Sequence, residues 1–145
     1  MKRYLIDGNN VVCIWKSVAK PTQSQEDQFL ALVRSSLRRN DKAVVVFDGP
    51  PRTGFRGSST EVRYSGQQKA DDILIHLIEN APEAAQLVVV SDDRQIRESA
   101  RHCQCLKASE FLAKALKSDH GPEKPGRVSP EETEQWIKDF EGRNP

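Results

Sequence analysis

The sequence contains no long hydrophobic run and few cysteines. No apolar stretch in the 145 residues approaches the roughly 18 that a membrane-spanning helix needs. The opening residues MKRYLIDGNN contain an apolar run that ends at Asp7, which is too short for the hydrophobic region of a signal peptide. The 3 cysteines are an odd number and imply no disulfide framework. These absences predict a cytoplasmic protein with no membrane partner.

Charge is nearly balanced over the whole chain but is unevenly distributed along it. The formal net charge is +1, and 30% of the residues are charged. Within 52–69, four basic residues accompany one acidic residue: Arg52, Arg56, Arg63 and Lys69 against Glu61. Such a segment is suited to holding a polyanion. A solvated loop that happens to be basic is the alternative interpretation.

Short apolar runs alternate with helical patterns along the chain. Strands are expected at 3–6, 43–47, 61–64, 87–90 and 103–106. Helices are expected after Ser24, at 70–80, at 94–101 and at 110–116, with a helix or turn near 11–15. This alternation predicts an α/β fold with a doubly wound, Rossmann-like parallel sheet of four or five strands flanked by helices.

A segment rich in glycine and proline divides the chain near its end. Residues 117–128 include Gly121, Pro122, Pro125 and Gly126, and they are interpreted as a linker. The α/β domain would then occupy residues 1–116, and a helical appendage would occupy 129–145. Ser129, Pro130 and Glu132 form a capping-box signature at the start of that appendage.

Acidic residues follow three of the expected strands and open one expected helix. Asp7, Asp48 and the pair Asp92 and Asp93 follow strands, and Asp71 and Asp72 open the helix at 70–80. Ligands bind beyond the carboxyl ends of the strands in open α/β sheets, so these carboxylates are expected to share a pocket. Crowded carboxylates repel one another and favour a cation. Oxygen ligands alone indicate Mg²⁺ or Mn²⁺.

Each of these polar residues also has a structural interpretation. Asp7 and Asp48 precede glycine, and either can stabilise a turn. The pair at 71–72 can interact with the helix dipole, and Asp93 is expected to cap the helix that follows it. Asn10 can orient Asp7, bind a phosphate or cap the next helix.

The motifs DGNN, VVVFDG, ADDILIHLI and VVVSDD, in this order, resemble the NYN-domain, PIN-like ribonucleases, in particular the YacP-like branch. The resemblance runs from about Tyr4 to Leu116, and the expected helix at 130–140 lies outside it. It implies a metal-dependent endoribonuclease that acts on RNA, either single-stranded or ribosome-associated. All four acidic positions are retained, which favours an active enzyme.

The resemblance also assigns roles to particular residues. The catalytic residues would be Asp7, Asp48, Asp71 and Asp92. Asp7, Asp71 and Asp92 would bind the metal, and Asp72 and Asp93 would be additional carboxylates around it or ligands of a second ion. Contacts to the RNA are expected from Asn10, Arg52, Arg56, Arg63, Lys69 and Arg94. Such a site would activate water for in-line attack on a phosphodiester.

Two other classes of function remain open from the residues. One is a module of the same fold that binds RNA or a ribosome without cleaving RNA. The other is a metal-dependent phosphohydrolase of small molecules. A haloacid-dehalogenase enzyme would need a second aspartate two residues after the first, where this chain has Asn9.

Overall fold

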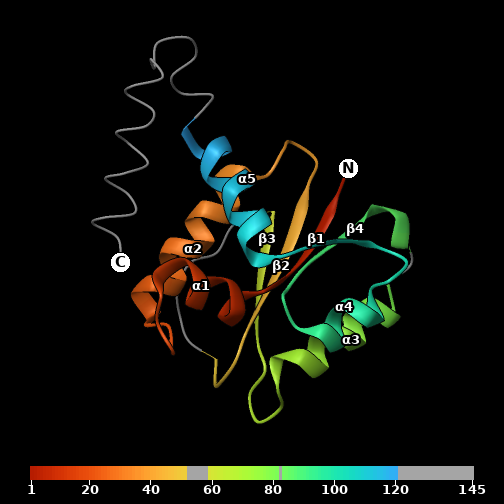
Figure 1. Cartoon of the computed structure of the whole chain (residues 1–145), viewed down its shortest axis with the longest axis horizontal. Helices are drawn as coiled ribbons and strands as arrows, with labels where there is room; N and C mark the ends of the chain where they lie inside the picture. The colour runs from red at the N-terminus through yellow and green to blue at the C-terminus, as the bar shows by residue number, and fades with distance from the viewer. Residues whose placement is uncertain (52–58, 82, 121–145) are drawn as a thin grey trace.

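The computed structural model describes residues 1–51, 59–81 and 83–120, which form a parallel sheet flanked by helices (Figure 1). Its strands are β1 (Arg3–Asp7), β2 (Lys42–Phe47), β3 (Thr60–Tyr64), β4 (Leu87–Val90) and β5 (Gln104–Leu106). The sheet has 5 strands in the order β3-β2-β1-β4-β5, and every neighbouring pair is parallel. The expected α/β sheet is therefore confirmed, with β1 in the middle.

Helices cover both faces of the sheet. They are α1 (Gly8–Lys16), α2 (Gln23–Ser36), α3 (Ala70–Glu79), α4 (Arg94–Ser99) and α5 (Ala108–His120), with a short 3₁₀ turn at Ala84–Gln86. Helices α1, α2 and α5 pack on one face, and α3 and α4 pack on the other (Figure 1). None of the helices in the described ranges is long and apolar enough to cross a membrane.

Alternate residues of β1 point to the two opposite faces of the sheet. Tyr4 and Ile6 belong to the core beneath α1, α2 and α5, whereas Leu5 belongs to the core beneath α3 and α4. This follows from the period of two in a strand. A middle strand covered on both faces must be apolar at every position, and that explains the continuous run that precedes Asp7.

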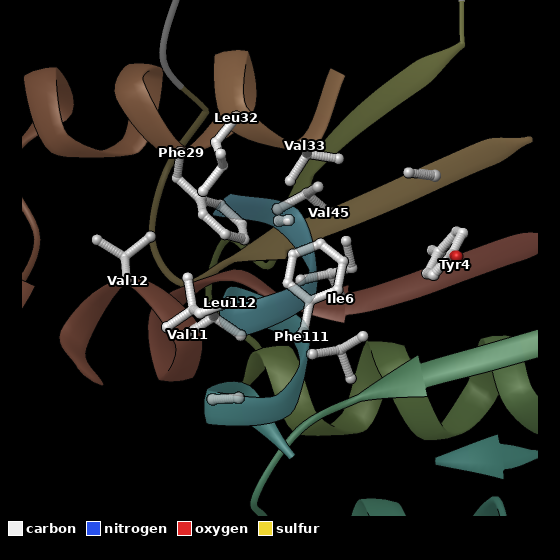
Figure 2. Packing of buried hydrophobic residues seen from close by; sticks show 14 of the residues in the cluster. Tyr4, Ile6, Val11, Val12, Phe29, Leu32, Val33, Val45, Phe111 and Leu112 are labelled. Carbon is white, nitrogen blue, oxygen red and sulfur yellow. The ribbon is translucent and has the colours of Figure 1, made fainter. Parts of the chain in front are cut away.

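The core beneath α1, α2 and α5 is built around aromatic rings. Phe29 of α2 and Phe111 of α5 meet edge to face, with ring centroids 6.2 Å apart. Tyr4 of β1 meets Phe111 in the same way at 6.1 Å. Figure 2 shows these rings between the sheet and the helices. Edge-to-face pairs contribute about 0.5 to 1.5 kcal/mol beyond the area they bury.

Two predicted helix starts are wrong. Thr22, and not Ser24, caps α2: its Oγ1 accepts the N–H of Gln25 at 3.1 Å, and the Gln25 side chain accepts the N–H of Thr22 at 3.0 Å. Helix α5 begins at Ala108, two residues before the predicted start at 110. The expected linker 117–128 overlaps the described chain only at its first four residues, which belong to α5, and the appendage at 129–145 lies outside the described residues.

Candidate functional site

Strand β1 passes directly into α1, and Asp7 stands at the junction. Asp7 is the last residue of β1 and the N-cap of α1, where its Oδ1 accepts the N–H of Asn10 at 3.4 Å. Gly8 lies against β2, because a Cβ added there would be 2.5 Å from Cε1 of Phe47 and 2.9 Å from the carbonyl oxygen of Val46. Only glycine fits this close approach, which holds the first turn of α1 against the neighbouring strand.

The Asp7 carboxyl group is buried and its charge is poorly solvated. Asp7 is 6% exposed, and its Oδ2 accepts the hydroxyl of buried Ser91 at 3.1 Å. Burial raises the pKa of Asp7 to about 6. The hydrogen bonds from Asn10 and Ser91 oppose this rise in pKa, and the negative charges of Asp71 and Asp48 add to it. A cation placed beside this carboxyl group would stabilise its charged form.

Two asparagines next to Asp7 connect β1 to the strand ends on either side. The side-chain oxygen of Asn9 accepts the N–H of Asp48, just after β2, at 2.7 Å. The side-chain oxygen of Asn10 accepts the N–H of Asp92, just after β4, at 2.9 Å. The DGNN motif therefore fixes the backbone at three neighbouring strand ends.

The other strand-end aspartates also hold helix starts. Oδ1 of Asp48 accepts the N–H of Ala70 at 2.9 Å, and Oδ1 of Asp92 accepts the N–H of Ala108 at 3.0 Å. Asp93 caps α4 through Ile96 at 3.1 Å. The structural roles expected for several of these carboxylates are therefore present, and each one anchors its carboxylate next to a helix start, where backbone N–H groups favour negative charge.

Electrostatic repulsion identifies the carboxylates that lie close to one another. The pKa of Asp71 is raised, first by burial and then by the negative charges of Asp93 and Asp48. The negative charges of Asp71 and Asp48 in turn raise the pKa of Asp7. Of the pair at 92–93, Asp93 is the residue whose charge acts on Asp71. Asp72 is exposed, and it also raises the pKa of Asp71.

The oxygen atoms of these carboxylates could hold a hydrated divalent cation, although they do not form a closed metal site in the described residues. Among residues 1–51, 59–81 and 83–120, no three His, Cys, Asp or Glu side chains are arranged to enclose a metal ion. Mg²⁺ typically keeps several waters and takes only one or two carboxylates, completing its shell with substrate phosphates. Asp7 and Asp71, with Asp48 and Asp93 nearby, offer only oxygen ligands and excess negative charge. That chemistry suits Mg²⁺ or Mn²⁺.

The basic residues expected to contact RNA are only partly placed. Arg52 and Arg56 lie outside the described residues. Arg63 pairs with Glu61 at 2.6 Å, and Arg94 pairs with Glu98 at 3.4 Å while remaining 92% exposed. Exposed pairs of this kind contribute at most about 1 kcal/mol, so these arginines can exchange partners.

Lys69 and Arg94 lie closest in sequence to the acidic residues. Lys69 is the exposed N-cap residue of α3, two residues before Asp71, and Arg94 directly follows Asp93 at the start of α4. Both therefore stand at the carboxyl end of the sheet.

Asn9 and Ser91 are structural parts of the site that the sequence analysis did not assign. Ser91 donates to Asp7 and accepts the N–H of Asp93 at 3.0 Å, so one hydroxyl connects two of the acidic residues. The sequence carried a signal for both, since Ser91 directly precedes Asp92 and Asn9 lies two residues after Asp7, and both side chains form hydrogen bonds.

A parallel five-stranded sheet with carboxylates at its strand ends is the arrangement of the PIN-like nuclease fold, to which the family matched by the sequence belongs. The sequence matches the YacP-like NYN domain over residues 4–139, and the chain belongs to that family. The match extends beyond residue 116, where we expected the resemblance to end.

Solved structures show the same architecture. The chain is similar to the crystal structure of Rae1 (YacP) from Bacillus subtilis, with 21% identity and a TM-score of 0.67 over 99% of this chain and 88% of that chain. It is also similar to a single-residue variant of Rae1, with 21% identity and a TM-score of 0.65 over 95% of this chain and 91% of that chain. No curated protein sequence matches this chain significantly.

Proposed function

We propose that the protein is a metal-dependent endoribonuclease that hydrolyses RNA phosphodiester bonds at the carboxyl end of its sheet. The observation that carries the proposal is the buried Asp7 carboxyl, whose pKa is raised to about 6 and to which Asp71 and Asp48 add negative charge. Carboxylates that repel one another are unfavourable unless a cation offsets their charge. Groups with pKa values shifted in this way cluster at functional sites. Membership of a family with a nuclease fold supports the same activity.

The catalytic aspartates would be Asp7, Asp48, Asp71 and Asp92, with Asp93 sharing the role of Asp92. Asp7, Asp71 and Asp92 would hold Mg²⁺ or Mn²⁺, and Asp72 and Asp93 would add negative charge around it or bind a second ion. A bound divalent ion supplies an activated water and stabilises the charge that develops on the phosphate. Ser91 and Asn10 keep the Asp7 carboxylate in place through their hydrogen bonds.

Substrate contacts are proposed at the basic residues that the sequence predicts to contact RNA. Lys69, Arg94 and Arg63 would bind phosphates, together with Arg52, Arg56 and the side chain of Asn10. These contacts are independent of base identity, so they position the RNA without selecting a sequence. The substrate would be RNA that is single-stranded or ribosome-associated.

A cleavage assay tests the proposal. Purified protein is incubated with a pool of single-stranded and folded RNA in Mg²⁺, Mn²⁺ or EDTA. Wild type should cut the RNA only with metal. Asp7→Asn should lose at least about a hundredfold in rate, because removing one charge-stabilising group typically costs a factor of about 10² to 10³. The matched control Asp27→Asn, on α2, should cut at the wild-type rate.

The outcomes separate the classes of function. RNA binding without cutting in any metal would contradict the enzyme and favour a binding module. Hydrolysis of small phosphate esters with intact RNA would favour the phosphohydrolase. Comparing Asp92→Asn with Asp93→Asn shows which of the pair is needed for chemistry.

A further inference from the structure

The opposite end of the sheet has a surface of unpaired positive charge. Five exposed basic residues gather where β1 and β2 begin, and we name them the basic edge: Lys2, Arg3, Arg38, Arg39 and Lys42. In the described part of the chain, none of them forms an ion pair with an acidic side chain. The Lys2 ammonium group contacts only the neutral side chain of Gln104, at 3.1 Å.

A buried aspartate holds these residues together. Asp41 is 6% exposed, and its two carboxylate oxygens accept the N–H of Lys2 at 2.9 Å and the N–H of Arg38 at 3.1 Å. These bonds fasten the connection between α2 and β2 to the start of β1. The N–H of Lys42 also donates to the carbonyl oxygen of Lys2 at 2.9 Å, and Arg3 and Lys42 are neighbours across the parallel ladder. The backbone of the basic edge is therefore fixed while its side chains project into solvent.

The basic edge is electrically independent of the acidic site. Arg3 and Asp7 are four residues apart on β1, which at about 3.3 Å per residue places them roughly 13 Å apart. The Debye length at physiological salt is about 8 Å. The two ends of the sheet therefore present opposite charge to a ligand, and Figure 1 shows that the chain start and the α2–β2 connection lie at the same end.

We propose that the basic edge binds the phosphate backbone of folded RNA and anchors it while another segment of that RNA reaches the acidic site. This inference rests on the proposed function, and it supplies what that function needs. An acidic site repels a polyanion, so the affinity must come from cations elsewhere. Three of the five residues are arginines, which bind phosphate through two parallel N–H groups.

Salt-dependent binding tests the anchor. Binding of a fluorescent RNA hairpin is measured in EDTA, which prevents metal-dependent cutting and makes the result independent of catalysis. Arg38→Gln with Arg39→Gln should reduce the slope of log K against log salt by about 1.8, at about 0.9 per lost phosphate contact. Lys2→Gln with Lys42→Gln should have a similar effect, because those side chains belong to the same surface.

The control removes two exposed lysines elsewhere, as Lys20→Gln with Lys117→Gln. The control protein should keep the wild-type slope. An equal change in slope for control and edge variants would contradict the proposal, since net charge alone would then explain binding. If the edge variants lost binding to vesicles of anionic lipid but bound RNA as wild type does, the proposal would also be overturned. The basic edge would then be a membrane-binding surface. If the edge variants cleave RNA normally and their salt slope is unchanged, RNA binding at the basic edge is refuted. The proposed nuclease activity is not affected by that result.

Discussion

Replacing Asp7 with asparagine should make the protein more stable while removing its activity. The Asp7 carboxyl is buried, and burial together with the charges of Asp71 and Asp48 raises its pKa from the ordinary 3.8 to about 6. Asparagine has the same shape and carries no charge. Its oxygen can accept the N–H of Asn10, and the Ser91 hydroxyl can reverse and accept from the new amide.

The size of the effect follows from the pKa. One pKa unit corresponds to about 1.4 kcal/mol, so the rise from 3.8 to about 6 corresponds to about 3 kcal/mol. The folded state binds the Asp7 proton more tightly than the unfolded state does. The resulting stabilisation is complete below pH 3.8 and is lost as the pH rises through about 6. An asparagine side chain does not titrate, so the free energy of unfolding of the variant should not fall in this pH range.

Urea unfolding between pH 4 and pH 8 measures the effect. The difference in free energy of unfolding between Asp7→Asn and wild type should be smallest at pH 4 and larger by up to about 3 kcal/mol at pH 8. Thr22→Ala, which removes no titratable group, is the control and should give a difference that does not vary with pH. A difference for Asp7→Asn that does not change with pH would refute the reasoning.

The same experiment with added Mg²⁺ connects stability to the proposed site. A ligand that binds only the folded state stabilises it by about 2.7 kcal/mol at a hundred times its dissociation constant. Wild type should gain stability with Mg²⁺ at pH 8, and Asp7→Asn should not. Equal gains for both proteins would place the ion elsewhere.

Two further predictions concern the elements that hold the site. Gly8→Ala should lower the free energy of unfolding by about 1 to 3 kcal/mol, because the added methyl would lie 2.5 Å from the Phe47 ring; an unchanged urea midpoint would contradict that contact. Thr22→Ala should cost about 1 kcal/mol by removing the N-cap of α2, whereas Ser24→Ala, two residues along, should cost much less; thermal unfolding of the two variants distinguishes the caps.

Much of the fold could be predicted because its strands are buried on both faces. Runs such as 43–47 and 87–90 are apolar at every position, which is typical of inner parallel strands, and the structure places β2 and β4 there. The position of Asp7 at the end of a middle strand follows from the same pattern. Strand order was not readable, because it depends on how the helices cross the sheet.

Helix starts were harder to predict because several residues compete to cap them. Thr22 and Ser24 are both suitable caps. Thr22 is the cap in the structure because it forms reciprocal hydrogen bonds with Gln25. The spacing of a threonine three residues before a glutamine was a usable signal. The start of α5 depends on Asp92, sixteen residues earlier in the chain, whose carboxylate accepts the N–H of Ala108.

The site was predicted as a group of acidic residues, but not in its internal arrangement. Asp92 and Asp93 are adjacent and equally acidic, and the turn of the backbone decides which charge acts on Asp71. The hydrogen bonds of Asn9 and Asn10 to the neighbouring strands depend on the register of the sheet. The residues were therefore visible in the sequence, whereas their contacts required the fold.

The central place of β1 has a consequence for synthesis. Strand β1 leaves the ribosome before the two strands that must flank it, β2 and then β4. A nascent chain that ends before Leu87 can pair β1 on one side only. Ser91, which holds the Asp7 carboxylate, arrives last of its partners. Because domains form from the N-terminus during translation, the site is completed only as the sheet itself is completed.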